Sequence, residues 1–337
     1  MDRLKVAITV KKFWRVISKE GIGSLTPPWG LRKGDKSIQE IRQKELGLLD
    51  HAEKEAQRIK EARLGLLERK HDSNPSDLKE SDFSGNNHAL MEKLESDQVN
   101  YQKTNKIRKE INLNRTLIEA ESYSDSDNNI ETDEDPEPDW IHRWKHYAEQ
   151  NSTENLRQMW ARALAGEIES PGTYSLRTLD FLHSLSQDEA LKIAKIGGFE
   201  LGGVVYKSDF LEKAGIDFPF LLQMDELGLL SGVQGGQVSG LDMTISSKST
   251  DSFFATFKLK NKIMLVTADS PEKSLKLPCY KLTRIGREIL KLGEFDFQKE
   301  YFFDLGQKIK KQGFMVKIGD WLQVDDTFGR VINPIEI

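Results

Sequence analysis

Two long stretches of helical periodicity dominate the N-terminal half of the chain. In residues 37–70, apolar side chains recur every three or four positions among charged and amide residues, and a weaker stripe runs from 88 to 120. The polar break H-D-S-N-P-S at 71–76 separates them. Two long amphipathic helices joined by a polar loop predict an antiparallel hairpin. Their narrow stripes can pair with each other or with a partner chain, including a second copy.

The charges are distributed unevenly along the chain. Residues 1–118 hold 24 basic and 18 acidic side chains, whereas residues 119–139 hold ten acids and no base. The basic half interleaves its charges, which is typical of solvated helices and not of a nucleic-acid arm. The acidic stretch has almost nothing to bury, so we expect a flexible linker over 122–138. A calcium loop is the alternative, but the glycine that its turn requires is absent.

The N-terminal segment, residues 1–36, mixes apolar and basic side chains. Such a pattern fits a docked amphipathic segment, which we favour, and also a helix on a membrane surface. No apolar run approaches the ~20 residues of a spanning helix, and the first apolar stretch is too short for a signal peptide. The single cysteine, Cys279, rules out an intramolecular disulfide and fits a reducing compartment. We therefore expect a cytoplasmic protein.

The densest apolar pattern begins at Asp139. The spacing places Trp140, Ile141, Trp144 and Ala148 on one helical face, and a second helix follows through Trp160 to Ile168. Asn151 with Glu154 resembles a capping box for this second helix. Ser175 precedes a further helix, and Ser186 with Glu189 forms a capping box for the one after it. The tryptophans are most simply core residues.

The order of elements predicted for residues 186–293 is that of a winged-helix domain. Helix 186–197, strand 204–206 and helices 208–215 and 219–228 come first, and helix 284–292 closes the domain. Alternating residues predict strands around 241–245, 253–259 and 263–268, which we interpret as the wing region. The C-terminus predicts a small β-meander. The fold class expected from these patterns is α+β, mainly α.

Composition and breaks divide the chain into six segments. They are an amphipathic N-terminal segment (1–36), a long helical hairpin (37–121), an acidic linker (122–138), a tryptophan-rich helical region (139–185), a winged-helix-like domain (186–293) and a C-terminal helix with β-meander (294–337).

Several segments together resemble a known family. They are N-R-T-L-I-E-A-E at 114–121, D-W-I at 139–141, Q-M-W-A-R-A-L-A-G-E-I at 158–168 and P-G-T-Y-S-L-R-T-L at 171–179. They resemble an uncharacterised bacterial family of unknown function, whose members have a helical N-terminal half and this tryptophan-rich signature. The resemblance implies no activity, because none is established for the family. It implies an origin among genes of mobile elements and defence islands. The acidic stretch between Glu121 and Asp139 looks like an insertion of this protein's own.

Glu167 is the most informative charge of the signature. It shares a helical stripe with Trp160, so it is predicted to face inward, where a carboxylate needs a partner or a shifted pKa. We predict a structural clamp with Arg177 that orders the Pro-Gly turn. The alternative is a general acid or ligand anchor, but no second positioned titratable group is evident. The resulting cluster of structural or functional interest comprises Trp140, Trp144, Trp160, Glu167, Ser175 and Arg177.

His142 and His146 are weak candidates for a metal pair. Their i, i+4 spacing suits two ligands on one helix, with Glu149 nearby. The zinc-protease pattern requires a glutamate directly after the first histidine, and this chain has Arg143 there. Exposed polar-face histidines are the simpler interpretation. We predict no metal and no cofactor.

Helix 219–228 is the position of a recognition helix in a winged-helix domain. It contains no lysine or arginine, and its polar residues are Gln223, Asp225 and Glu226. Affinity for DNA depends on neutralising phosphates, so this helix favours a protein partner. These three residues form our candidate interaction surface.

Two main hypotheses for function follow, from different classes. The first is a non-enzymatic protein-interaction or regulatory component of a bacterial phage-defence or mobile-element system. The second is a nucleic-acid binder that uses the hairpin's basic residues and the wing lysines Lys258, Lys260 and Lys262. An enzyme of unrecognised type is the third, because no catalytic motif is readable.

Overall fold

The protein divides into two compact units, residues 1–174 and 175–337. A computed structural model describes residues 2–25, 38–71, 83–124, 134–233, 241–247, 250–259, 261–296, 298–324 and 329–337. Helices dominate the first unit, and the strands of the described residues all belong to the second. This confirms the predicted fold class, α+β and mainly α.

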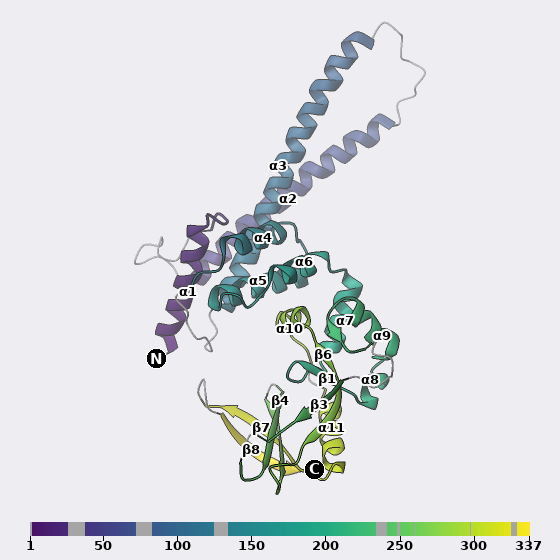
Figure 1. The fold of residues 1–337 in the computed structure, drawn as a ribbon. Coiled ribbons are helices and arrows are strands. Elements are labelled where there is room, and N and C mark those ends of the chain that lie inside the picture. The colour runs from purple at the N-terminus through teal and green to yellow at the C-terminus, as the bar shows by residue number, and fades with distance from the viewer. Residues whose placement is uncertain are drawn as a thin grey trace. The chain divides into compact units, whose positions relative to one another are not determined.

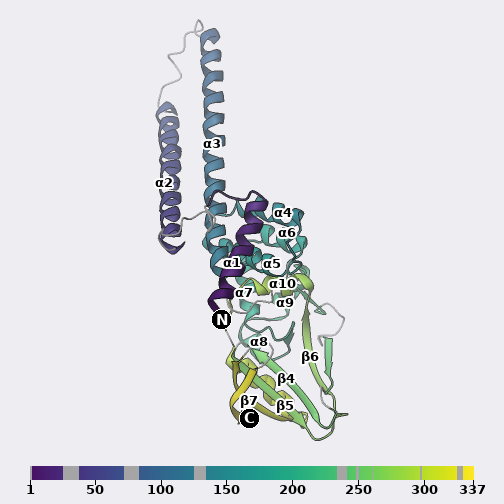
Figure 2. The same ribbon diagram turned by 90° about the vertical axis from the view of Figure 1, so that its left-hand side faces the viewer.

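The first unit is built on a long helical hairpin. Helices α2 (Ile38–His71) and α3 (Phe83–Tyr123) pack against each other. Figures 1 and 2 show them side by side, extending away from the other helices of the unit. Their bounds agree closely with the two periodic stretches of the sequence. The loop between them lies outside the described residues.

Three further helices pack around the C-terminal part of α3. They are α1 (Asp2–Lys19), α4 (Pro138–Ala148) and α5 (Glu154–Glu169). The face of α4 that the spacing predicted is buried in this core, as is the C-terminal half of α1. The largest fully buried side chains of the unit include Phe13, Trp14, Ile17, Leu113, Leu117, Trp144, Trp160 and Leu164. The described part of the N-terminal segment is therefore docked through the C-terminal half of α1, in line with the favoured interpretation.

The acidic stretch that precedes α4 is described only in part, because residues 125–133 lie outside the described residues. Asp135, near its end, forms ion pairs of 2.7 Å with Arg15 and 2.9 Å with Lys19, both on α1. These contacts lower the pKa of Asp135, with the Lys19 hydrogen bond as the largest cause. The end of the acidic stretch thus meets basic residues of the docked N-terminal helix.

The second unit begins with four helices and one short strand. Helices α6 (Leu176–Ser184) and α7 (Gln187–Gly197) precede β1 (Val204–Tyr206), and α8 (Asp209–Lys213) and α9 (Phe218–Glu226) follow it. The predicted capping box of α7 is present, with the Ser186 hydroxyl and Glu189 carboxylate each bonded to the other's backbone. Ser208 and Asp217 cap α8 and α9 through their side chains.

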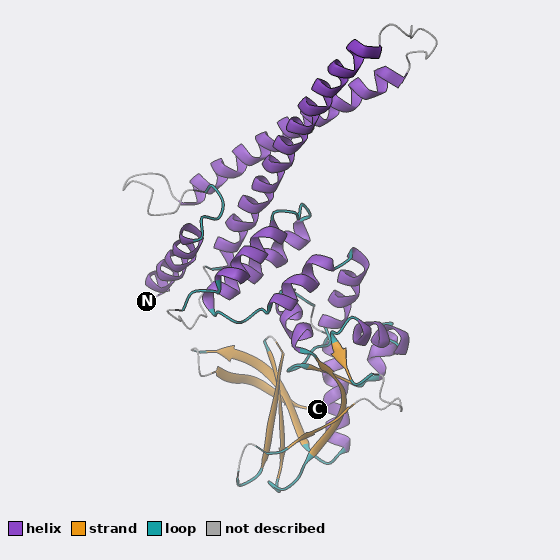
Figure 3. Ribbon diagram, turned by 45° about the horizontal axis from the view of Figure 1, so that its top comes forward, coloured by secondary structure: helices purple, strands orange, loops and turns teal. Residues whose placement is uncertain are grey.

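Two antiparallel sheets complete the second unit (Figure 3). The first has the order β1-β6-β2, with β3 also on β6, and its strands are β2 (Leu230–Ser231), β3 (Leu241–Ile245) and β6 (Leu275–Leu282). The second has the order β4-β5-β7-β8, from β4 (Phe253–Leu259), β5 (Lys262–Ala268), β7 (Met315–Gln323) and β8 (Gly329–Glu336). Helix α10 (Arg284–Lys291) follows β6, and α11 (Lys299–Lys311) packs on β7.

The strand pairing differs from the sequence-based expectation in one respect. Strands were predicted at 253–259 and 263–268, and they are present, but they pair with the C-terminal strands and not with the sheet that β1, β2, β3 and β6 form. Val266 of β5 lies opposite Val316 of β7, and both are buried. The expected wing and the expected C-terminal β-meander are therefore parts of one sheet, because shared apolar faces join them.

Candidate functional site

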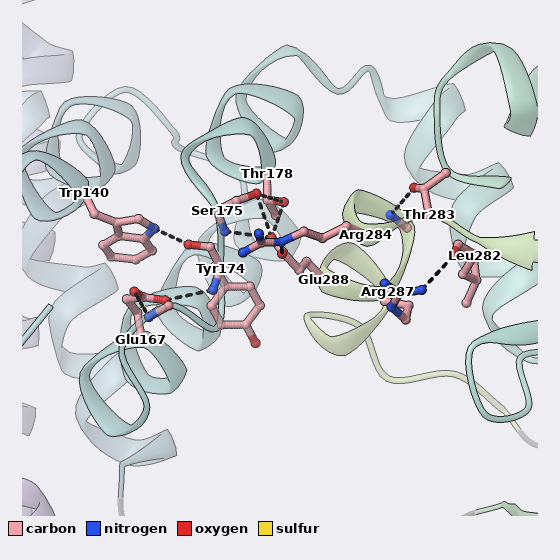
Figure 4. Close-up of polar contacts among 12 residues, drawn as sticks. Trp140, Glu167, Tyr174, Ser175, Thr178, Leu282, Thr283, Arg284, Arg287 and Glu288 are labelled. Carbon is pink, nitrogen blue, oxygen red and sulfur yellow. Dashed lines mark hydrogen bonds and ion pairs between the residues drawn. The ribbon is translucent and has the colours of Figure 1, made fainter. Parts of the chain in front are cut away.

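The turn that ends α5 is organised by a buried carboxylate. Glu167 is 3% exposed, and its two oxygens accept hydrogen bonds from the backbone N–H groups of Gly172, at 2.6 Å, and Tyr174, at 2.8 Å. Figure 4 shows the carboxylate facing the main chain of this turn. Gly172 has a φ of +85°, a conformation that favours glycine. The P-G-T-Y sequence therefore folds around the Glu167 side chain.

Two other residues of the signature hold the same turn. The indole N–H of Trp140 donates to the Tyr174 carbonyl at 2.8 Å (Figure 4). The Tyr174 ring lies on α5 at Gly166, where an added Cβ would come within 2.9 Å of the ring. Trp140, Gly166 and Glu167 of the signature thus all contact Tyr174, which explains why these residues occur together.

The remaining signature tryptophans lie in the core between α4 and α5. The Trp144 indole N–H donates to the Trp160 carbonyl at 2.9 Å. Trp160 is fully buried, and its ring centroid lies 5.9 Å from that of Tyr147. Its indole N–H is the one buried side-chain polar atom among the described residues without a hydrogen-bond partner. Both rings serve as core, as the sequence suggested.

The predicted partner of Glu167, Arg177, has an exposed side chain on α6, which belongs to the second unit. The hydrogen bonds that order the turn come from the main-chain amides of Gly172 and Tyr174. Backbone N–H dipoles that point at a carboxylate stabilise its negative charge. The inward orientation of Glu167 was predicted from the sequence, whereas its ligands were not.

A second buried carboxylate, Glu288 on α10, binds the start of α6. It accepts hydrogen bonds from the Ser175 backbone N–H at 2.7 Å, the Thr178 hydroxyl at 2.5 Å and the Arg284 side chain at 2.6 Å. The Ser175 hydroxyl donates to it as well, at 2.9 Å (Figure 4). Ser175 is thus the N-cap residue by position, but its side chain makes no capping bond. Burial raises the pKa of Glu288, but these donors outweigh burial and lower it overall.

The sequence analysis missed a third buried carboxylate, Glu121 on α3. Its oxygens accept a 2.6 Å hydrogen bond from the Trp14 indole and a 2.7 Å one from Arg42 Nε. The Arg42 guanidinium also lies 4.6 Å from the centre of the Trp14 ring and pairs with Glu45. Burial lowers the pKa of Arg42, yet its pairing with Glu121 and Glu45 raises it overall. This cluster joins α1, α2 and α3.

One sequence signal could have identified Glu121. It continues an i, i+4 series with Leu113 and Leu117, and both leucines are buried. An acid in such a series is predicted to face the core. Nothing local pointed to its partners, because Trp14 and Arg42 precede it by 107 and 79 positions.

The two candidate metal ligands of α4 contact other groups. His142 Nε2 lies 3.7 Å from the Glu20 carboxylate, and His146 contacts the Gln150 side chain at 3.1 Å. Asn151, predicted to cap α5, instead donates to the Tyr147 carbonyl at the end of α4. The N-cap residue of α5 is Thr153, which makes no side-chain capping bond, so the predicted box is wrong. Within the described ranges, no group of three or more His, Cys, Asp or Glu side chains could hold a metal ion.

The candidate interaction surface lies on the outer side of α9. Gln223 and Glu226 are exposed, and Asp225 is half-buried. The opposite side of the helix packs Phe220, Leu221 and Met224 into the unit. Gln223 and Glu226 therefore project away from the core, whereas Asp225 is partly covered.

Comparison with known families agrees with the position of the signature. Among the described residues, no helix is long and apolar enough to cross a membrane. The comparison with curated proteins and that with solved structures returned no match. A family model described as a protein of unknown function (DUF2806) matches residues 98–211, from within α3 to α8, a span that contains every segment of the signature.

Proposed function

We propose that the protein is a non-enzymatic interaction component whose α9 surface (Gln223, Asp225 and Glu226) binds a basic segment of a protein partner. The observation that carries this proposal is the outward acidic side of α9. From Phe199 to Ser247 there are two basic and seven acidic residues, a net charge of 2 − 7 = −5. Such a surface attracts lysine and arginine side chains and repels phosphates.

Further acidic side chains lie on α8 and at the start of α9. Asp209, Glu212 and Asp217 are exposed and add negative charge. Phe218 is 50% exposed, which offers an apolar anchor beside the acids. Interfaces combine an aromatic anchor with a charged rim, so an amphipathic basic helix is the occupant that best fits.

The buried carboxylates also support a scaffold role. Glu121, Glu167 and Glu288 each bind donors that hold helices or turns. A general acid or base needs an accessible proton and a substrate nearby, and these hydrogen bonds supply a different use for each group. From the resemblance of the signature we further propose a cytoplasmic role in a bacterial phage-defence or mobile-element system. The gene neighbourhood tests that part.

The alternative, nucleic-acid binding, relied on the lysines of the expected wing. Lys258 lies 4.6 Å from the centre of the Trp321 ring and donates to Gln323. Lys262 is paired with Asp320. Lys260 lies outside the described residues. Engaged in these contacts, Lys258 and Lys262 are poor phosphate ligands, which favours the protein-partner proposal.

Binding of defined probes to the full chain tests the proposal. The probes are a short amphipathic lysine/leucine peptide, its glutamate/leucine counterpart and duplex DNA, each followed by fluorescence anisotropy at several salt concentrations. We expect the basic peptide alone to bind. Asp225→Lys with Glu226→Lys should weaken its binding about tenfold or more, because attraction becomes repulsion.

The matched control reverses two exposed acids in the turn after β5, Asp269→Lys with Glu272→Lys. This variant changes the net charge equally and should bind like the wild type. Equal weakening in both variants would reduce the effect to overall charge and contradict an α9 site. Micromolar binding of duplex DNA at physiological salt would favour the nucleic-acid alternative.

A further inference from the structure

The two ends of α3 differ in how they are covered. Every residue from Ile111 to Glu121 is buried or half-buried, because α1, α4 and α5 pack around this part. From Tyr101 to Glu110, most side chains are exposed. One helix thus passes from a segment that other helices surround to one whose described side chains are mostly exposed, with α2 alongside it (Figure 2).

Where side chains of the hairpin are described, several apolar ones stay exposed or half-buried. On α2, Leu49, Ala52 and Ala56 recur at helical spacing, and they are only half-buried. Four large hydrophobic side chains on the two helices are exposed to solvent. Leu48 is 71% exposed, Val99 47%, Tyr101 62% and Ile107 43%. Two paired helices leave part of their apolar surface exposed to water. A bundle of four helices encloses that surface.

The charges of the hairpin indicate what kind of partner suits it. Helix α2 holds eight basic and seven acidic residues, 8 − 7 = +1, and α3 holds six of each, 6 − 6 = 0. The signs interleave along α2, whereas on α3 most acids lie toward the two ends and the bases lie mainly between them. A nucleic acid or an acidic membrane requires an excess of positive charge, which the two helices as a whole lack. A surface with both signs in balance is complementary to a copy of itself, because each acid can face a base.

We propose that the α2–α3 hairpin pairs with the hairpin of a second copy of this chain to form a four-helix bundle. A two-helix face about 20 Å wide, overlapping over about 40 Å, offers about 800 Å² per copy, which matches a stable interface of standard size. The exposed residues Leu48, Val99 and Ile107 lie in this contact. The proposal does not depend on the α9 surface, so either can fail alone.

Analytical ultracentrifugation of the full chain across the micromolar range tests the bundle. We expect a reversible dimer in the wild type. Leu48→Glu with Ile107→Glu should raise the dimer dissociation constant at least about tenfold, because it places charges in an apolar contact. Val99→Glu, on α3 like Ile107, should also raise the dimer dissociation constant. The control is Leu191→Glu on α7, whose side chain is as exposed as that of Leu48, and it should dimerise normally.

Thermal unfolding by circular dichroism at a concentration where the wild type is monomeric separates lost association from lost folding. Exposed positions tolerate substitution, so all variants should unfold like the wild type there. A wild type that sediments as a monomer throughout overturns the proposal and leaves the stripe to solvent or to a different protein. A dimer that Leu48→Glu with Ile107→Glu and Val99→Glu leave unchanged overturns it as well.

Discussion

The base of the helical hairpin and the turn after α5 each enclose a buried carboxylate, and they stabilise its charge by different means. Glu121 at the base faces the Arg42 guanidinium and the Trp14 indole. Glu167 at the turn receives two main-chain N–H groups. The first arrangement joins three helices that are distant in sequence, whereas the second orders the turn that directly follows α5. A buried glutamate therefore joins helices in the first case, at Glu121, and orders a local turn in the second, at Glu167.

The largest effect is expected at Glu121. Glu121→Ala leaves Arg42 buried without its main partner and the Trp14 N–H without an acceptor, which should cost about 3–5 kcal/mol of unfolding free energy. Chemical denaturation measures it. Adding Arg42→Met should recover part of the loss, since it removes the stranded charge. If Glu121→Ala proves as mild as an exposed substitution, the cluster does not hold the helices together.

A smaller effect is expected at Glu167. Glu167→Gln keeps one acceptor oxygen for the two N–H groups of Gly172 and Tyr174, so we expect a loss of about 1–3 kcal/mol. The control is Glu169→Gln, two residues further along the same helix, which should lower the free energy of unfolding less than Glu167→Gln. If Glu167→Gln kept the wild-type melting temperature while binding of a probe or cellular function was lost, Glu167 would be a functional site and the structural explanation would be wrong.

The smallest effect is expected on the pH dependence of stability, and it concerns a third buried carboxylate, Glu288. Its pKa is lowered in the folded state, so the unfolded state binds the proton more readily. The stabilisation is present above the ordinary glutamate pKa of about 4.3 and is lost as the pH falls through the folded value. Glu288→Gln should therefore reduce the difference in stability between neutral and acidic pH, measured by denaturation at each pH. An unchanged difference would show that Glu288 makes no such contribution.

Much of the local structure could be predicted because its causes are local. Helical periodicity predicted α2, α3 and the buried face of α4, and the Ser186–Glu189 capping box depends on residues three apart. The Asn151–Glu154 pattern shows the limit of this reasoning. Asn151 binds the end of the preceding helix instead, and sequence spacing cannot decide between two nearby helix ends.

The sequence by itself determined which segments are helices or strands and that Glu167 faces inward, since periodicity and propensity act within a few turns. Only the tertiary structure decided what these elements meet. It paired β5 with β7 and brought Trp14 and Arg42 to Glu121. Such contacts form between groups far apart in the chain, where many partners satisfy the same apolar or charged side chain. The choice among them depends on packing the whole unit, which no local pattern encodes.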